Sequence, residues 1–305
     1  MRVTRSLGRG PGCRGAAPAG NLPLMSRHVA IVTDSTAYLP PQTMERHGIT
    51  AVPLTVVIGD RALEEGTEVS ARTLAQALQK RRPVTTSRPS PELFAATYRA
   101  AAEAGARGVI SLHLSAEFSG TYDAAALAAK DAPVPVRVVD TRMVGMALGF
   151  CALTAAEVVD AGGSIDEAVA AAEKRAAGTS AFFYVDTLDY LRRGGRIGAA
   201  QALLGSALAV KPLLELDGGR IELREKVRTA SKAIARLEEI AVERAGSGTV
   251  DVAVHHLSAP ERAAVLADRL RKRLPGVGEL RVSEVGAVIG AHTGPGLLAV
   301  VVSPR

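Results

Sequence analysis

From residue 28 onward, short apolar runs alternate with longer segments of helical periodicity. The apolar runs that indicate buried strands are residues 28–34, 49–58, 108–114 and 136–140. Between them, residues 91–105 predict a helix with Ser90 as its N-cap and Pro91 at its first position. Strands and helices that alternate at this spacing favour a parallel sheet covered by helices. The first half of the chain is therefore predicted to be a Rossmann-like α/β domain.

The pattern changes after two further helices, which are predicted over residues 144–161 and 166–177. A hairpin is expected around Asp217-Gly218-Gly219, because this glycine-rich turn joins two strand-like runs within residues 212–227. Helices are then predicted over residues 229–245 and 260–274, on either side of a strand at 249–257. Strands and helices are more segregated here, which favours an α+β domain. We predict a leader at 1–27, an α/β domain at 28–178 and an α+β domain at 179–305.

The positive charge of the chain is concentrated in that leader. The whole sequence has a net charge of +6, and residues 1–27 hold five arginines and no acid, which leaves +1 for residues 28–305. A nearly neutral body argues against nucleic-acid binding. The leader lacks hydrophobic periodicity, and two interpretations stay open: a disordered extension ahead of a true start at Met25, or an organellar transit peptide.

Composition narrows the chemistry that the folded part can support. Cys13 and Cys151 form no disulfide framework, which favours a cytoplasmic location, and no apolar run is long enough for stable membrane insertion. The six histidines show no metal-ligand spacing, so neither a metal nor a cofactor is expected. Aromatic residues make up 3% of the chain, with no Trp. A ligand pocket is therefore expected to have mainly aliphatic walls.

Hydroxyl groups collect where the predicted strands end. The segments concerned are Asp34-Ser35-Thr36, Thr85-Thr86-Ser87, Ser119-Gly120-Thr121 and Asp140-Thr141. Ligands of open α/β sheets bind beyond the carboxyl ends of the strands, where helix N-termini and hydroxyls suit a carboxylate or a phosphate. The same residue types are also ordinary N-caps. No nucleophile–base pair stands among them, so no catalytic residue is predicted.

One histidine has an unusual setting. His292 lies in the segment GAHTGPG, just before the last apolar strand. Three glycines within seven residues indicate a close backbone approach or positive φ angles, which are common beside ligands. His292 can donate to an anion or simply cap its loop. His255 and His256 lie within an apolar strand and are interpreted as structural.

Taken together, several segments resemble one known family. In chain order they are VTDSTAYLP, TTSRPSPELF, HLSAEFSGTYDAA, VVDTRMVGMALG, LDYLRRGGRIG, LLGSALAVKPLLEL, KVRT and GAHTGPG. Their order and spacing are similar to those of the DegV family of bacterial fatty-acid-binding proteins, over residues 28–305. This resemblance implies a two-domain protein that buries one long-chain fatty acid between its domains and serves as an acyl carrier for a fatty acid kinase.

The resemblance also implies roles for individual residues. The family's carboxylate-binding positions correspond to Thr86, Ser87, Ser119 and His292. Its arginines for head-group presentation or kinase docking correspond to Arg196 and Arg228. One departure is Arg88, which stands where the family usually has Gln and adds a guanidinium at this rim.

Two further functions are alternatives to the carrier. One is an enzyme on small anionic substrates, a phosphotransferase or hydrolase that uses Asp34 or Asp140. Both carboxylates could equally cap helices. The other, a DNA-binding regulator, fails because the body of the chain is nearly neutral. The favoured hypothesis is a non-catalytic carrier that presents a fatty-acid carboxylate to a separate kinase.

Overall fold

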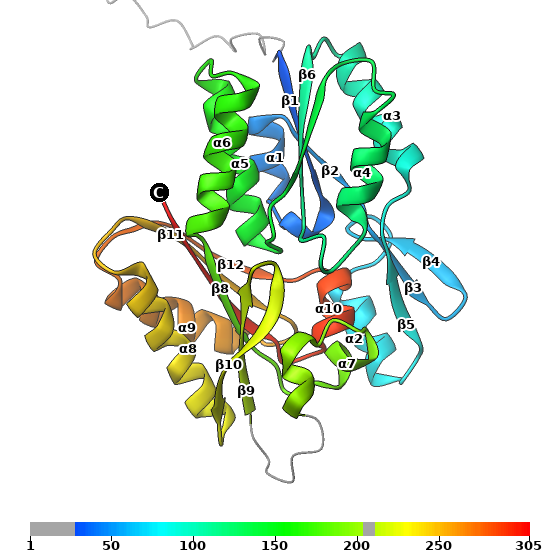
Figure 1. Ribbon diagram of the computed structural model, residues 1–305. Coiled ribbons are helices and arrows are strands. Elements are labelled where there is room, and N and C mark those ends of the chain that lie inside the picture. Colours follow the sequence, from blue (N-terminus) through cyan, green and yellow to red (C-terminus); the bar gives the residue numbers. More distant parts are fainter. Residues whose placement is uncertain (1–27, 204–210) are drawn as a thin grey trace, which may run out of the picture.

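A computed structural model describes residues 28–203 and 211–305. The predictions made for the leader, including Cys13 and the start at Met25, lie outside the described residues. The described chain forms two halves, one built on a parallel sheet and one on a mixed sheet (Figure 1). The expected fold class, a Rossmann-like α/β domain followed by an α+β domain, is confirmed. The predicted boundary near residue 178 falls between the last helix of the first half and the first strand of the second.

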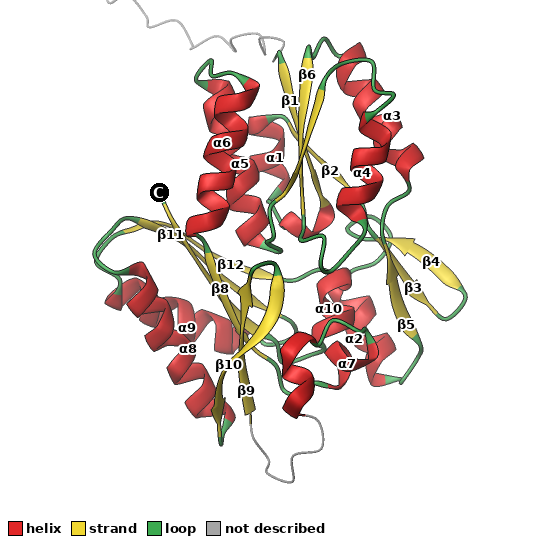
Figure 2. Cartoon of the chain, in the orientation of Figure 1, coloured by secondary structure: helices red, strands yellow, loops and turns green. Residues whose placement is uncertain are grey.

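The first half is a four-stranded parallel sheet with helices on both faces. Its strands have the order β2-β1-β6-β7 and comprise β1 (Val29–Asp34), β2 (Ile49–Val52), β6 (Gly108–His113) and β7 (Val136–Asp140). One face is covered by α1 (Pro41–His47), α5 (Met146–Asp160) and α6 (Ile165–Gly178), the other by α3 (Pro91–Glu103) and α4 (Thr121–Ala129) (Figure 2). Ser90 caps α3 as predicted, since its side chain accepts from Leu93 N–H.

A small antiparallel sheet projects from the first half. It has the order β4-β3-β5 and consists of β3 (Thr55–Ile58), β4 (Arg61–Glu64) and β5 (Val84–Ser87), with α2 (Ala71–Gln79) between the last two. We call residues 55–87 the flap. The single strand expected at 49–58 is wrong, because β2 and β3 belong to different sheets. Pro53 lies between them and has no N–H group to donate to a continuous ladder.

The second half is a six-stranded sheet of the order β10-β9-β8-β13-β11-β12. The strands are β8 (Ser180–Tyr184), β9 (Lys211–Asp217), β10 (Arg220–Val227), β11 (Val250–His256), β12 (Val277–Glu284) and β13 (Leu298–Pro304). The predicted hairpin is confirmed, with Gly218 and Gly219 at positive φ in its turn. One face carries α8 (Ala230–Ala245) and α9 (Pro260–Arg273), and the other faces the first half (Figure 1). Short elements α7 (Asp189–Arg193), η2 (Gly198–Leu203) and α10 (Ala287–Thr293) lie between strands, and η1 (Ser35–Ala37) follows β1.

The two halves share one apolar core. A single cluster of buried residues joins Ile110 and Leu148 of the first half to Phe183 and Val301 of the second. Polar contacts reinforce the joint, among them an ion pair of 2.6 Å between Arg175 on α6 and Asp251 on β11. The relative position of the halves is therefore fixed by packing. No helix in the described ranges is long and apolar enough to span a membrane.

Candidate functional site

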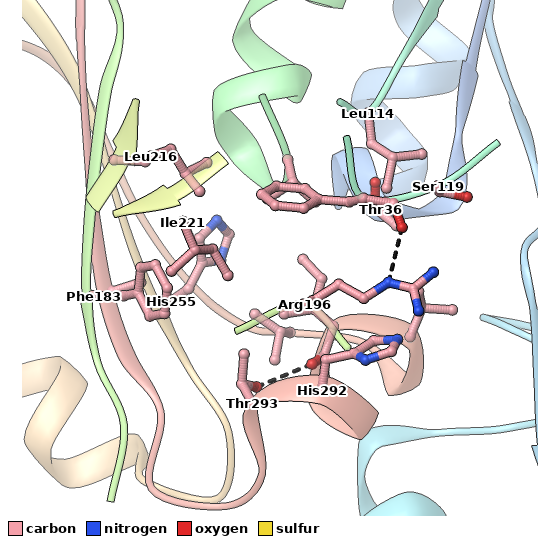
Figure 3. A pocket seen from close by; sticks show the side chains of 18 of the residues that line it. Thr36, Leu114, Ser119, Phe183, Arg196, Leu216, Ile221, His255, His292 and Thr293 are labelled. Carbon is pink, nitrogen blue, oxygen red and sulfur yellow. Dashed lines mark hydrogen bonds between the residues drawn. The ribbon is translucent and has the colours of Figure 1, made fainter. Parts of the chain in front are cut away.

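A cavity lies where the flap, the two halves and α10 meet. The empty space between its walls is about 990 Å³, which includes open solvent at its mouth. Most of the wall is aliphatic or aromatic: Leu54, Leu114, Phe118, Val144, Ala181, Phe182, Phe183, Leu191, Leu216, Ile221, Val285, Val288, Ile289, Leu297, Ala299 and Val301. Figure 3 shows apolar side chains such as Phe183, Leu216 and Ile221 pointing into this space.

Polar side chains line another part of the same wall, and four of them are those predicted from the sequence. Thr86, Ser87, Ser119 and His292 all line the cavity. The Thr86 hydroxyl lies 2.7 Å from His292 Nε2, so β5 of the flap meets α10 across 206 positions of sequence. Ser119 Oγ lies 2.8 Å from the Thr121 hydroxyl. The exposed Ser87 donates weakly to the Arg88 carbonyl at 3.3 Å.

The local structure around Thr86 and His292 differs from the expectation. Thr86 does not end a strand of the parallel sheet but lies within β5, on the half-buried side of the flap. His292 does not lie in a loop but in the last turn of α10. The glycines around His292 indicate a loop, but Gly290 lies inside α10, and Gly294 ends the helix at φ +72°.

His292 is neutral at physiological pH. Burial, helped by the positive charge of Arg196, lowers the pKa of its imidazole to about 4. Its Nδ1 is buried without a hydrogen-bond partner among the described residues, and it lies against Gly194, where an added Cβ would be 2.0 Å away. A neutral ring offers an anion one N–H donor and no charge. The positive charge at this end of the cavity therefore comes from arginines.

Two guanidinium groups supply that charge. Arg196 lines the cavity and donates to the Phe118 carbonyl at 3.0 Å and to the Gly194 carbonyl at 2.6 Å, so it also holds the glycine-rich turn. The exposed Arg88 lines the cavity beside Gly120, the N-cap of α4. Within the described ranges, no carboxylate lines the cavity, and neither arginine has an ion pair. The arrangement suits a bound anion.

Arg228 does not join this group. It is exposed and follows β10 on the way to α8, outside the cavity lining. The two candidate carboxylates of the enzyme hypothesis are also elsewhere. Asp34 is fully buried, and its oxygens accept hydrogen bonds from Thr36 and from Leu114 N–H. Asp140 accepts from Ala116 and Arg142 N–H groups. Both carboxylates therefore cap backbone N–H groups, and Asp34 also lies 3.1 Å from Nδ1 of the buried His113.

His255 is a second histidine in the cavity wall that the sequence placed only in a strand. Its Nε2 accepts from Met146 N–H at 3.0 Å, at the first residue of α5, and its Nδ1 lies 3.0 Å from the Ser283 hydroxyl. Burial lowers its pKa to about 4. Both ring nitrogens are thus used within the protein, Nε2 to join the two halves and Nδ1 to join neighbouring strands of the second half, as expected for a structural residue. No cluster of potential metal ligands occurs in the part of the chain that the structure describes.

Comparison with known proteins identifies the family. A family model described as "Uncharacterised protein, DegV family" matches residues 28–305. The chain belongs to the DegV family. A DegV domain-containing protein of Streptomyces coelicolor is 80% identical over 281 residues, which cover 92% of this chain and all of that protein. The resemblance noted in the sequence is therefore confirmed.

Solved DegV structures are similar over nearly the whole chain. A Thermus thermophilus protein described by its fatty acid binding has a TM-score of 0.87 at 35% identity, covering 91% of this chain and 100% of its own. DegV of Bacillus subtilis, described as a fatty acid binding protein, has a TM-score of 0.85 at 37% identity, covering 92% of this chain and 100% of its own. Both therefore share the overall fold of this chain.

Proposed function

We propose that this DegV protein binds one long-chain fatty acid in the cavity between its halves and does not itself catalyse a reaction. The observation that carries the proposal is the division of the cavity wall into a large aliphatic part and a small polar part, whose two guanidinium groups have no ion pair in the described part of the chain. An acyl chain matches the first and a carboxylate matches the second. The fatty acid binding described for the Thermus and Bacillus relatives supports this assignment.

The tail is expected to dominate affinity. Each buried methylene contributes about 0.8 kcal/mol, so a chain with about 14 methylenes gains on the order of 11 kcal/mol. A hydrogen bond to a charged group contributes about 1.5–3 kcal/mol net. Thr86, Ser87, Ser119 and His292 are therefore proposed to orient the carboxylate more than to retain the ligand.

The test of fatty acid binding is direct. Lipid extracted from the purified protein and analysed by mass spectrometry should contain a long-chain fatty acid in stoichiometric amount. Ser119→Ala and His292→Ala should still carry lipid, with affinity reduced by about ten- to a hundredfold. A wild-type protein that is empty and takes up no labelled fatty acid would overturn the proposal, and an enzyme on small anions would then become the better hypothesis.

We further propose that the bound carboxylate is presented to a separate fatty acid kinase in the cytoplasm. The likeness to the DegV family supports the partner, and the single described cysteine, the buried free thiol of Cys151, supports the location. Arg196 is proposed to serve head-group presentation, and the exposed Arg228 is proposed to contact the kinase. Arg228→Ala should retain lipid and lose acyl-phosphate formation in a kinase-coupled assay. Loss of lipid with normal phosphorylation would reverse this assignment.

A further inference from the structure

Glu65 is a buried acid that the proposed binding site does not use. It follows strand β4 in the flap, and its residue is 5% exposed. Glu64 and Glu68, in the same acidic stretch, are exposed. A buried carboxylate is costly unless hydrogen bonds compensate for the lost solvation. Its contacts therefore indicate what it holds in place.

Three parts of the molecule meet at this carboxylate. Oε2 accepts from the Ser35 hydroxyl at 2.5 Å, and Oε1 lies 3.3 Å from the donating Tyr38 hydroxyl, both in the segment that follows β1. Oε1 also accepts from Val288 N–H of α10 at 2.7 Å. The carboxylate thus connects the parallel-sheet domain, the flap and α10.

The packing at the start of α10 is too close for a larger residue. A Cβ added at Gly286, the residue before this helix, would lie 2.2 Å from Glu65 Oε1. The backbone of Gly286 has φ −72°, so the requirement for glycine there is one of space and not of backbone conformation. The Glu65 carboxylate is therefore packed directly against the first turn of the helix.

The opposite end of the same helix carries His292. Val288 and His292 are four residues apart, which places them on one face of the helix about 6 Å apart along its axis. Val288 N–H donates a hydrogen bond to Glu65 after β4, and His292 Nε2 lies within hydrogen-bond distance of Thr86 of β5, both at the end of the flap where β3 begins. The flap therefore holds α10 at two points, and a shift at Val288 moves His292.

We propose that Glu65 is a positioning residue for the fatty-acid carboxylate, acting through α10 on the orientation of His292. This inference rests on the proposed function, since it concerns the same binding site. The Glu65 side chain acts as a hydrogen-bond acceptor that is long enough to reach Val288 N–H. Glutamine at this position keeps an oxygen for Val288 N–H, whereas aspartate is one methylene too short.

The test compares two ligands that differ only in the head group, hexadecanoic acid and hexadecan-1-ol. Dissociation constants for both are measured on delipidated full-length protein. Glu65→Ala and Glu65→Asp should weaken acid binding about tenfold and alcohol binding less than about twofold. Glu65→Gln should restore the wild-type preference for the acid. Glu64→Ala, an exposed acid in the same stretch, is the matched control and should change neither constant.

A double-mutant cycle with His292→Ala decides whether the effect passes through the histidine. If it does, Glu65→Asp should cause no further loss of acid binding once His292 is absent. Additive losses, or equal losses for the acid and the alcohol, would overturn the positioning role. A wild-type protein that binds neither ligand would instead overturn the proposed function, so the two failures are distinguishable.

Discussion

Two histidines lie in different parts of the cavity wall, His255 on β11 and His292 on α10 (Figure 3). Their electrostatics are alike, because burial lowers the pKa of each imidazole ring to about 4. Their hydrogen bonds differ. His255 uses Nε2 for Met146 N–H and Nδ1 for Ser283, whereas His292 contacts Thr86 through Nε2, and its Nδ1 has no partner among residues 28–203 and 211–305.

This difference separates a structural histidine from a candidate binding residue. The partners of His255 are buried or half-buried protein groups on two different halves, so its ring joins them. The partner of His292 is a half-buried hydroxyl that itself lines the cavity. A perturbed pKa alone therefore does not identify the site, since both rings share it. The number and location of the hydrogen-bond partners distinguish the two histidines.

The largest expected effect is on stability. His255→Ala leaves Met146 N–H and the Ser283 hydroxyl unpaired beside a new cavity, which should lower the free energy of unfolding by about 2–4 kcal/mol. His292→Ala should lower it by less than about 1 kcal/mol, because only one hydrogen bond to a half-buried hydroxyl is lost. Urea unfolding of delipidated protein measures both. Equal losses would remove the distinction between the two rings.

A second effect concerns pH. The folded-state pKa of His255, about 4, lies below the value of about 6.5 for an unfolded chain. Between these values the unfolded state binds a proton that the folded state does not. The contribution of His255 to the free energy of unfolding is therefore fully present above about pH 6.5. It is lost as the pH is lowered toward 4, and it amounts to a loss on the order of 3 kcal/mol.

His255→Gln isolates this contribution, because glutamine keeps an acceptor for Met146 N–H and does not titrate. The free energy of unfolding of His255→Gln should depend less on pH than that of the wild type, over pH 6.5 to 4. Parallel curves for the two proteins would show that His255 is already protonated in the folded state, contrary to its hydrogen bond with Met146.

A smaller effect is expected from the space beside His292. Gly194 has φ −76°, so alanine fits its backbone, but its Cβ would lie 2.0 Å from His292 Nδ1. Gly194→Ala should displace the ring, weaken fatty acid binding about tenfold and lower the free energy of unfolding by about 1–3 kcal/mol, the usual cost of overpacking. Gly248→Ala, where nothing lies within 4 Å of the added carbon, is the matched control. Unchanged binding in Gly194→Ala would mean that the position of His292 does not matter for the ligand.

The smallest expected effect is a change in the pKa of the histidine rings when ligand binds. A carboxylate near a histidine favours the charged ring, so bound fatty acid should raise the pKa of His292 by about one unit. His255 should shift much less, because its nitrogens already have protein partners. Two-dimensional NMR of the labelled rings follows both in one titration, with and without hexadecanoic acid. A shift confined to His255 would place the carboxylate in the other part of the cavity.

Much of the fold could be predicted from local patterns. The period of the apolar residues, the cap of α3 and the glycine turn of the β9–β10 hairpin are all short-range signals, and the structure bears them out. The flap was missed because residues 49–58 form one apolar run, and such a run does not reveal that its two halves pair with different strands. Helix α10 was missed because the glycines around His292, of which Gly290 lies inside the helix, resemble those of a loop.

The candidate site divides in the same way. The quoted motifs drew attention to Thr86, Ser119, His292 and Arg196, and all of them line the cavity, although their functional roles stay predictions. Arg228 came from the same resemblance and lies outside the cavity. Neither outcome follows from local sequence, since the bond between Thr86 and His292 joins residues 206 positions apart.

The acidic stretch of the flap shows most clearly what each level decides. By itself the sequence specifies alternating elements, their caps and turns, and the residue types that a ligand site requires, because these depend on neighbours within a few positions. It presents Glu64, Glu65 and Glu68 as equivalent acids. Only the tertiary structure buries Glu65 and aims its carboxylate at Val288 N–H, 223 positions away. Burial depends on which distant segments pack together, and that is decided by the whole chain at once.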